Sequence, residues 1–381
     1  MKYVINSHNT TSIGTYTITK YLVKCLLEHT HISCDDKFYV TLPNSKVCQE
    51  IQQLGSSNNV RLIHFCNTQT FFRFFLRCFY DFLIFPLFTF LIRPKSILIM
   101  ANYCPVKCYG RKIVLMRHSY LVDDNIYHNA SPRIKIVEII RRVLFTLTLR
   151  STDVLIVQSE YMKKLFLEKY RFERSKVKVL TNPVGDSLKE ISKYRNRNCP
   201  REKIILYASR YYPHKNHSFI TTLAQCYSTE LRGKNIKFFI TIDTNSDKDA
   251  TRFLNSIINE HLGDIVVNVG LLPQEQLVEY YLTSTLLFFP SKTESFGNPI
   301  VEAMTLGLPI VVPNLDYARI LCEDCAMYYK HDDIHDAYNK LISICENEAM
   351  WNCYSQKSSE QSKKFLSVDE WTHKLLTIMK L

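Results

Sequence analysis

Two glutamates, Glu294 and Glu302, are separated by seven residues in the stretch ESFGNPIVE, which follows a short apolar run. Within this stretch Gly297 allows the backbone to approach a ligand closely, and Pro299 is typical of the first turn of a helix. We therefore expect Glu294 in the loop before a helix whose N-terminus can bind an anion, and Glu302 about one turn inside that helix. Carboxylates in these places could accept hydrogen bonds from sugar hydroxyls. Taken alone, they are better explained as acids that compensate the helix dipole.

A second group of candidate residues lies in the sequence SRYYPHKN, which follows the apolar run 204–208. Arg210 and Lys215 would leave the end of a strand on a loop, where cations can meet a diphosphate. For one basic loop alone, a pair of solvated surface cations is the alternative. The coincidence of this loop with the glutamate stretch favours a shared anion site.

The elements that must position these residues follow from short apolar runs that alternate with helical patterns. Continuous apolar runs of this kind are typical of parallel strands buried on both faces. Strands are expected at 3–6, 38–42, 60–65, 97–100, 113–116, 154–157, 177–180, 204–208, 236–240, 265–269, 286–289 and 310–312. The pattern predicts an α/β protein with doubly wound, Rossmann-like domains at 1–185 and 186–367, followed by a C-terminal helix within 368–381. Ligands bind beyond the carboxyl ends of such strands, so we expect the site in a central cleft between the domains.

Together these motifs resemble the family 4 retaining glycosyltransferases of the bacterial surface-polysaccharide type, which have the GT-B fold. The two glutamates at this spacing and the loop with Arg and Lys are the hallmarks of that family. The resemblance implies that Glu302 holds the ribose hydroxyls of a nucleotide sugar and that Glu294 contacts the donor sugar. It also implies that Arg210 and Lys215 neutralise the departing diphosphate, which stabilises the transition state more than the ground state.

Further donor contacts are implied by the same resemblance. They would come from the backbone at Gly297, Asn298, Pro299 and Ile300, and from Leu271 near the base. Because two side-chain cations would neutralise the leaving group, we expect no metal and no other cofactor. The nucleotide diphosphate sugar would be the donor substrate.

In the first domain the resemblance covers fewer residues. The family usually has a Gly-Gly pair after the first strand, whereas here Gly14 stands alone before the expected helix and takes the donor-facing position. His118 follows the strand at 113–116, where many relatives place an active-site histidine or asparagine. The resemblance implies that His118 positions the acceptor or the donor sugar, and an ordinary loop histidine is the alternative.

The positive charge of the chain is confined to its first half. Residues 1–185 have 26 basic and 12 acidic side chains, a net +14, whereas residues 186–381 have 22 and 24, a net −2. Such asymmetry predicts that the first domain faces a polyanion, either an anionic membrane surface or a nucleic acid. No stacking platform or recognition fold for nucleic acid is evident.

A phenylalanine-rich segment, 71–90, lies in this basic domain and holds nine phenylalanines. Asp81 and Pro86 interrupt it, so its apolar part is too short to span a bilayer. Basic residues flank it: Arg73, Arg77, Arg93 and Lys95. A second basic helix is expected from Pro132, with Arg133, Lys135, Arg141 and Arg142. Either segment could lie on a membrane surface, while burial of the aromatic side chains in the domain core is an equal alternative.

The number and spacing of the cysteines indicate in which cellular compartment the protein is expected. Thirteen cysteines, an odd and irregularly spaced set, and the lack of an apolar signal segment at the N-terminus indicate a reducing cytosol. The pairs Cys104/Cys108 and Cys322/Cys325 resemble halves of a zinc site, but no histidine follows either at ligand spacing. Buried or inert thiols are the favoured interpretation.

These observations predict a cytoplasmic glycosyltransferase, peripheral at the inner face of the cell membrane. It would move a sugar from a nucleotide diphosphate to a lipid-linked glycan acceptor in O-antigen or capsule synthesis. The expected partners are the nucleotide sugar, that acceptor and an anionic membrane surface, with no nucleic acid. The alternatives are a GT-B-fold epimerase acting on a free nucleotide sugar, and a basic nucleic-acid-binding protein.

Overall fold

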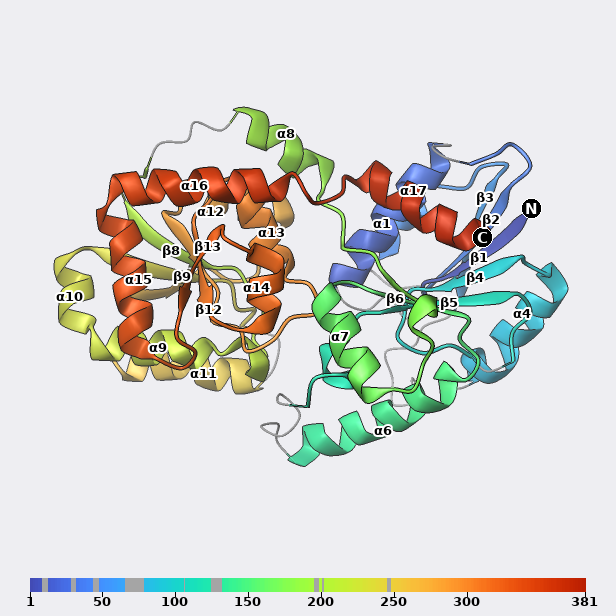
Figure 1. The fold of residues 1–381 in the computed structure, drawn as a ribbon, viewed down its shortest axis with the longest axis horizontal. Coiled ribbons are helices and arrows are strands. Elements are labelled where there is room, and N and C mark those ends of the chain that lie inside the picture. The colour runs from blue at the N-terminus through green and yellow to red at the C-terminus, as the bar shows by residue number, and fades with distance from the viewer. Residues whose placement is uncertain are drawn as a thin grey trace. The chain divides into compact units, whose positions relative to one another are not determined.

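The computed structural model describes residues 1–8, 13–28, 32–43, 48–65, 79–105, 107–124, 132–194, 199–200, 202–244 and 248–381. The chain divides into two compact units, one of Met1–Pro183 with Leu366–Leu381 and one of Val184–Phe365 (Figure 1). The division lies close to the break expected after residue 185. The C-terminal helix, expected as a separate segment, belongs to the first unit.

The first unit is built on a sheet of seven parallel strands in the order β3-β2-β1-β4-β5-β6-β7. The strands are β1 (Lys2–Asn6), β2 (Lys37–Pro43), β3 (Val60–Phe65), β4 (Ser96–Ile99), β5 (Arg111–Met116), β6 (Val154–Val157) and β7 (Val177–Val179). The helices are α1 (Ile13–Leu27), α2 (Gln49–Gln53), α4 (Phe85–Ile92), α6 (Pro132–Leu149), α7 (Glu160–Lys169) and α17 (Val368–Lys380). Short helical turns occur at η2 (Tyr80–Ile84), η3 (Ser119–Leu121) and η4 (Arg174–Lys176). All four residues of β6 are buried, as expected for a strand covered on both faces.

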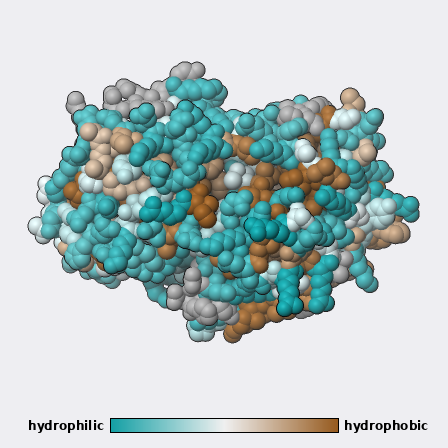
Figure 2. Space-filling view, viewed as in Figure 1, coloured by the Kyte–Doolittle hydropathy of each residue, from teal (hydrophilic) through white to brown (hydrophobic). Residues whose placement is uncertain are grey.

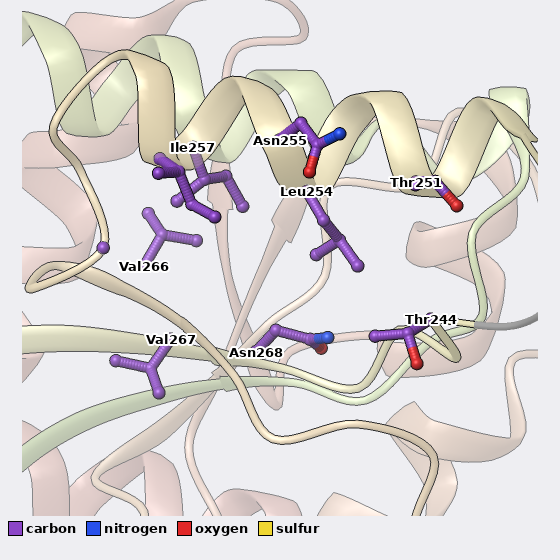
Figure 3. Close-up of a pocket in the computed structure, with 10 residues that line it drawn as sticks. Thr244, Thr251, Leu254, Asn255, Ile257, Val266, Val267 and Asn268 are labelled. Atoms are coloured by element: carbon purple, nitrogen blue, oxygen red, sulfur yellow. The ribbon is translucent and has the colours of Figure 1, made fainter.

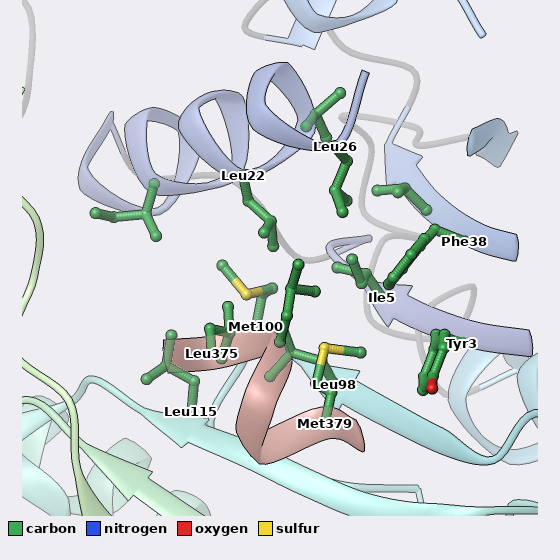
Figure 4. Packing of buried hydrophobic residues seen from close by; sticks show 14 of the residues in the cluster. Tyr3, Ile5, Leu22, Leu26, Phe38, Leu98, Met100, Leu115, Leu375 and Met379 are labelled. Carbon is green, nitrogen blue, oxygen red and sulfur yellow. The ribbon is translucent and has the colours of Figure 1, made fainter. Parts of the chain in front are cut away.

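Helix α17 completes the core on one face of this sheet. Figure 4 shows its Leu375 and Met379 beside Leu98 of β4 and Leu22 of α1, and all four side chains belong to one buried cluster. The Ser96 hydroxyl donates a hydrogen bond to the Met379 carbonyl at 2.7 Å. The other face carries a second cluster, in which residues of α4, α6 and α7 pack on the sheet.

The second unit contains six parallel strands in the order β10-β9-β8-β11-β12-β13. They are β8 (Lys203–Tyr207), β9 (Ile236–Ile240), β10 (Val266–Asn268), β11 (Leu286–Phe288), β12 (Ile310–Pro313) and β13 (Ala326–Tyr329). The helices are α8 (Asp186–Tyr194), α9 (His217–Cys226), α10 (Ser228–Gly233), α11 (Lys248–Asn259), α12 (Gln274–Thr283), α13 (Asn298–Thr305), α14 (Asp316–Cys322), α15 (Ile334–Glu346) and α16 (Glu348–Ser362). A 3-10 turn, η5 (Pro213–Lys215), precedes α9. Two Rossmann-like, doubly wound units are thus present, and the predicted fold class is confirmed.

The cysteine pairs agree with the interpretation as inert thiols. Cys104, Cys322 and Cys325 are buried, Cys108 is half-buried, and all four are free. Burial raises the pKa of the Cys108 thiol to about 12 and that of Cys322 well above its ordinary value. Within the described part of the chain, no group of three histidine, cysteine or acidic side chains could hold a metal ion. No helix there is long and apolar enough to cross a membrane.

Candidate functional site

Two loops of the second unit, after β8 and after β11, are tied to each other by hydrogen bonds. The His214 carbonyl accepts one from the Lys292 N–H at 2.8 Å and one from the Ser291 hydroxyl at 3.2 Å. The Tyr317 hydroxyl of α14 donates to the Ser291 carbonyl at 2.6 Å. The loops at the carboxyl ends of these two neighbouring parallel strands are therefore joined to each other, at the place where this fold class is predicted to bind ligands.

Lys215 and Glu294 meet across these loops. The Lys215 Nζ lies 2.6 Å from the Glu294 Oε1, and the two side chains are only 14% and 9% exposed. The ammonium also lies 5.2 Å from the centre of the Phe289 ring, and the Tyr207 hydroxyl donates to the Lys215 carbonyl at 2.5 Å. The structure thus brings together two predicted site residues that are far apart in the sequence. Their catalytic roles stay predictions.

Arg210 lies on the loop after β8, as Lys215 does, and is half-buried. Among the described residues no side chain forms an ion pair or hydrogen bond with its guanidinium. The loop therefore holds one cation paired with a carboxylate and one cation whose charge is not compensated by a direct partner. Such an arrangement can bind an anion.

Glu302 lies inside α13, where the sequence places it, and its carboxylate is held from α12. The Tyr281 hydroxyl donates to the Glu302 Oε2 at 2.9 Å. Burial raises the pKa of the Glu302 carboxyl, and the hydrogen bond from Tyr281 opposes this shift. A hydrogen-bond donor from a ligand, such as a hydroxyl, would further stabilise the carboxylate.

The start of α13 differs in one respect from the expectation. Pro299 has no N–H, and the Ile300 N–H donates to the Gly297 carbonyl at 3.0 Å. The Ile300 N–H is therefore not free to bind a ligand, because the first turn of the helix already uses it. Helix α13 begins at Asn298, so Pro299 lies in its first turn as predicted.

Gly297 precedes α13 in a left-handed conformation, with φ of 91°. A Cβ at this position would lie 3.0 Å from the Leu321 Cδ2 and 3.4 Å from the Ile300 Cδ1. Only glycine adopts this conformation without strain, and a Cβ would also require the Leu321 side chain to move slightly. The glycine thus sets the direction in which α13 leaves the loop that carries Glu294.

Leu271 follows β10 on a loop stabilised by one side chain. The Asn268 Oδ1 accepts hydrogen bonds from the N–H groups of Ile242 at 2.9 Å and Gly270 at 3.2 Å, and its Nδ2 donates to the Ile242 carbonyl at 3.0 Å. Leu271 is 44% exposed at the tip of this loop. Its predicted contact with a nucleotide base stays a prediction.

A cavity in the second unit lies elsewhere, between α11 and β10 (Figure 3). Its lining is mainly apolar, with Leu254, Ile257, Val266 and Val267. None of the predicted donor-site residues lines it. We therefore do not assign the donor to this cavity.

In the first unit, Gly14 lies one residue inside α1, which begins at Ile13, and not before the helix as expected. The Arg117 Nη2 donates to the Gly14 carbonyl at 3.0 Å. Burial lowers the pKa of the Arg117 guanidinium to about 10. Residues 9–12 of the same loop lie outside the described ranges.

His118 is held on three sides at the end of β5. Its Nε2 lies 3.1 Å from the Glu138 Oε2 of α6, and its ring stacks on Tyr120 with centroids 5.4 Å apart. The backbone N–H of His118 donates to the Asn102 Oδ1 at 3.2 Å. His118 is therefore fixed in place, more so than an ordinary loop histidine, and its role at the site stays a prediction.

Glu138 is the buried partner in this arrangement. Its side chain is 3% exposed, lies within hydrogen-bond distance of the His118 ring and forms an ion pair with Arg141. Burial acts to raise the pKa of Glu138, but the hydrogen bond and charge of His118, together with Arg141, hold that pKa below its ordinary value. The carboxylate thus stabilises the fold at neutral pH.

We expect Glu138→Gln to lower the free energy of unfolding by about 1 to 3 kcal/mol at neutral pH. The folded-state pKa is lowered, so this stabilisation is present above the ordinary carboxyl pKa and is lost as the pH falls through the lowered value. The difference between wild type and variant should therefore shrink in acid. Denaturant unfolding across pH measures it, with Glu190→Gln as control because Glu190 pairs with Lys193 on the surface. A difference that is absent at neutral pH, or that persists unchanged in acid, would contradict this role.

Three residues that position the candidate site were not predicted. Tyr281 holds Glu302, Glu138 holds His118, and Asn102 binds the backbone after β5. The contacts are between residues distant in the sequence, so no local motif marks Tyr281 or Asn102. Glu138 does carry a signal, because it is the only acid among the basic and apolar residues of α6.

Comparison with solved structures identifies the class of this fold. The chain is similar to the Anabaena protein HepE, solved in complex with UDP and glucose, with a TM-score of 0.72, 15% identity and coverage of 100% of this chain and 99% of that one. This likeness and the two Rossmann-like units establish the GT-B fold of glycosyltransferases. Residues 189–363 match the family model described as "Glycosyl transferases group 1". The second unit therefore carries a group 1 glycosyltransferase domain, and the predicted resemblance to glycosyltransferases is confirmed.

Two curated relatives match parts of the chain. An uncharacterized 41.2 kDa protein in the cps region of Klebsiella pneumoniae is 24% identical over 238 residues, 58% of this chain and 59% of that protein. The O-antigen chain mannosyltransferase B of Escherichia coli is 25% identical over 97 residues, 26% of each chain. The matched regions thus span about three-fifths and a quarter of these relatives. Neither the epimerase nor the nucleic-acid-binding alternative is favoured by these similarities.

Proposed function

We propose that this protein transfers a sugar from a nucleotide diphosphate donor to a glycan acceptor with retention of the anomeric configuration. The observation that carries the proposal is the connected pair of loops in the second unit, where Lys215 meets Glu294 and Arg210 lies nearby in the sequence. Glu302 and its partner Tyr281 supply an acceptor for the ribose hydroxyls. The relative solved with UDP supports a nucleotide donor.

The chemistry required at such a site fits these side chains. As the bond between the anomeric carbon and the diphosphate oxygen breaks, positive charge grows on the sugar and negative charge on the leaving group. Arg210 and Lys215 would stabilise that negative charge as it develops. Glu294 would accept a hydrogen bond from the sugar. An acceptor hydroxyl would form the new bond to the anomeric carbon on the face from which the diphosphate leaves, and its proton would pass to the departing diphosphate oxygen. No metal ion is assigned a step.

For the acceptor we propose a lipid-linked glycan in the synthesis of a surface polysaccharide. The relatives support this proposal, since one is from a cps region and another is named for the O-antigen chain. The enzyme would act in the cytoplasm, peripheral at the inner face of the cell membrane. The net charge of +14 over residues 1–185 supports an encounter with an anionic surface.

A panel of uridine and guanosine diphosphate sugars tests the donor. The sugar that raises the midpoint of thermal unfolding most should also release its nucleoside diphosphate when a lipid-linked acceptor is added. Release that depends on the acceptor supports a transferase. Conversion of the nucleotide sugar to an isomer without any acceptor would support the epimerase instead.

Glu302→Ala should weaken binding of the matching nucleoside diphosphate by about 1.5 to 3 kcal/mol, because a charged acceptor of hydroxyl hydrogen bonds is removed. For the wild type, affinity should fall as the pH is lowered through the raised pKa of Glu302, since only the carboxylate accepts from both hydroxyls. The variant should lack this pH dependence. Titration calorimetry at several pH values measures both effects, with Glu279→Ala, an exposed acid of α12, as control. Unchanged affinity in Glu302→Ala would remove this residue from the site.

A further inference from the structure

Helix α6 exposes most of the apolar side chains that the structure describes on it. Ile136, Val137, Ile139, Ile140, Val143 and Leu147 are 46% to 60% exposed. Figure 2 shows hydrophobic surface along the lower edge of the view, where Figure 1 places α6. A helix on the surface of a water-soluble protein normally shows the reverse arrangement.

The inner face of α6 is occupied largely by polar contacts. Glu138 pairs with His118, and the Arg142 guanidinium donates to the Tyr120 carbonyl at 2.6 Å while pairing with Asp124 at 2.7 Å. Among the α6 residues whose side chains are described, the buried apolar ones, Phe145 and Leu149, lie toward the C-terminal end. The outward position of the isoleucines and valines is therefore fixed by specific contacts on the opposite side.

A second element of the same unit exposes apolar residues in the same way. This element consists of η2, α4 and the residue before them. Its exposed apolar side chains are 52% to 71% exposed and belong to Phe79, Phe82, Leu83, Leu87, Phe90 and Leu91. Phe85 of α4 and Phe145 of α6 belong to one buried cluster, so both helices cover the same face of the sheet. We call the outward sides of α6, η2 and α4 the apolar surface.

The described part of the phenylalanine-rich segment, residues 79–90, is partly buried and partly exposed. Residues 79–90 contribute to the core and to the exposed surface, because Tyr80 and Phe85 are buried while Phe82 and Phe90 face outward. Residues 71–78, with Arg73 and Arg77, lie outside the described ranges. Helix α4 itself contains no basic residue, and its exposed side chains include Phe90 and Leu91.

Positive charge lies beside the apolar surface. Arg93 ends α4 with its guanidinium 5.7 Å from the centre of the Phe90 ring, and Arg150 is exposed after α6. Arg141 is 44% exposed on α6 itself. The only acid on α6, Glu138, pairs with Arg141 and so offsets the charge of that residue, whereas the charges of Arg93 and Arg150 are not offset by it.

We infer that the apolar surface binds anionic phospholipid, with α6 and α4 lying in the plane of the bilayer interface. Exposed apolar area on this scale marks an interaction site in a soluble protein. A second copy of the chain would place these cations against the same cations, whereas an anionic bilayer complements them and accepts the apolar side chains. Nucleic acid would meet the cations but leave the aliphatic side chains of α6 uncovered. The inference deepens the proposed function, since the purpose of the docking rests on a lipid-linked acceptor.

Co-sedimentation of the full-length protein with vesicles of phosphatidylglycerol and phosphatidylcholine tests the inference. The double variant Ile139→Asn/Ile140→Asn should partition at least tenfold less strongly than wild type into vesicles that contain phosphatidylglycerol. Ile258→Asn is the matched control, because Ile258 is a 68% exposed isoleucine on α11 of the second unit. It should bind as wild type does. Both isoleucines of the double variant are exposed, so the fold should tolerate the change, and thermal unfolding verifies this.

A second variant reports insertion directly. Trp351 and Trp371 are both buried, so they give a constant background in fluorescence. The emission of Val143→Trp should shift to shorter wavelength on addition of phosphatidylglycerol vesicles, and brominated lipid should quench it. Salt at 1 M should release part of the protein only, since screening removes the electrostatic attraction while the apolar contacts persist.

The outcomes separate the alternatives. Loss of vesicle binding in the double variant, with quenching of the new tryptophan, supports the inference. If the double variant binds vesicles as strongly as wild type does, the inference is overturned. The inference is also overturned if wild type forms a dimer in sedimentation velocity that the double variant loses, while vesicle binding is unchanged. RNA binding that the double variant abolishes would also overturn it. Nucleotide affinity is measured without vesicles and tests only the donor site, whereas vesicle binding tests only the apolar surface. Failure of one proposal can therefore be distinguished from failure of the other.

Discussion

Lys215→Ala should lower turnover about 10²- to 10³-fold while changing the donor Michaelis constant much less. The ammonium is expected to act on negative charge that develops on the departing diphosphate, and loss of one such group from a preorganised site has effects of this size. Arg210→Ala should behave in the same way. Steady-state kinetics with the donor identified by the panel measures both variants.

Lys215 has a second effect that must be separated from the first. Its removal leaves Glu294, a 9% exposed carboxylate, without its ion-pair partner, which should destabilise the fold by about 1 to 3 kcal/mol. The double variant Lys215→Ala/Glu294→Gln should recover stability but not turnover. Lys363→Ala, which breaks an exposed pair with Glu360, should change neither. A change confined to the Michaelis constant would mean that Lys215 binds the donor without assisting bond cleavage.

Gly297→Ala should destabilise the loop between β11 and α13, which carries Glu294. The left-handed conformation costs roughly 1 to 2 kcal/mol for any residue with a Cβ, and the added carbon would lie 3.0 Å from the Leu321 Cδ2. If the loop shifts to relieve the contact, the start of α13 moves, and a displacement of about 1 Å at a site can reduce activity about 10²-fold.

Gly233→Ala is the matched control for this prediction. Gly233 is the last residue of α10, and a Cβ added there would have no neighbouring atom within 4 Å, so alanine should be neutral or slightly stabilising. Denaturant unfolding and donor binding should both be measured. Wild-type stability and affinity in Gly297→Ala would show that the loop accepts the methyl group and does not depend on glycine.

The arrangement of Lys215 and Glu294 shows what the sequence could predict. Each residue follows an apolar run that forms a strand, β8 or β11, and those strands are neighbours in the sheet. Periodicity located the strands, and the rule that sites form beyond their carboxyl ends indicated that both residues lie on loops of a candidate site. The ion pair between the two side chains was not predicted. Strand β13 was not predicted, because its short sequence AMYY between two helices carries little signal.

The contact of Tyr281 with Glu302 and the orientation of α6 are two features that could not be predicted from the sequence. The hydroxyl of Tyr281 reaches Glu302 through the packing of α12 against α13, and nothing in the local sequence of α12 distinguishes this tyrosine from Tyr280. For α6, periodicity reveals an apolar side but not whether that side faces the core. The inward direction was decided by Glu138 and Arg142, whose partners lie in the loop after β5.

Helix α6 also determines how far His118 would lie from a bilayer bound to the apolar surface. Its outer side is the apolar surface, and Glu138 on its inner side holds the His118 ring. With side chains, a helix is about 10 Å across. If α6 lies on lipid, His118 stands roughly one helix diameter above the level of the inserted side chains. An acceptor anchored in the same bilayer would then present to His118 only those sugars that lie near its lipid end, and the far end of a long glycan would pass beyond the reach of this histidine.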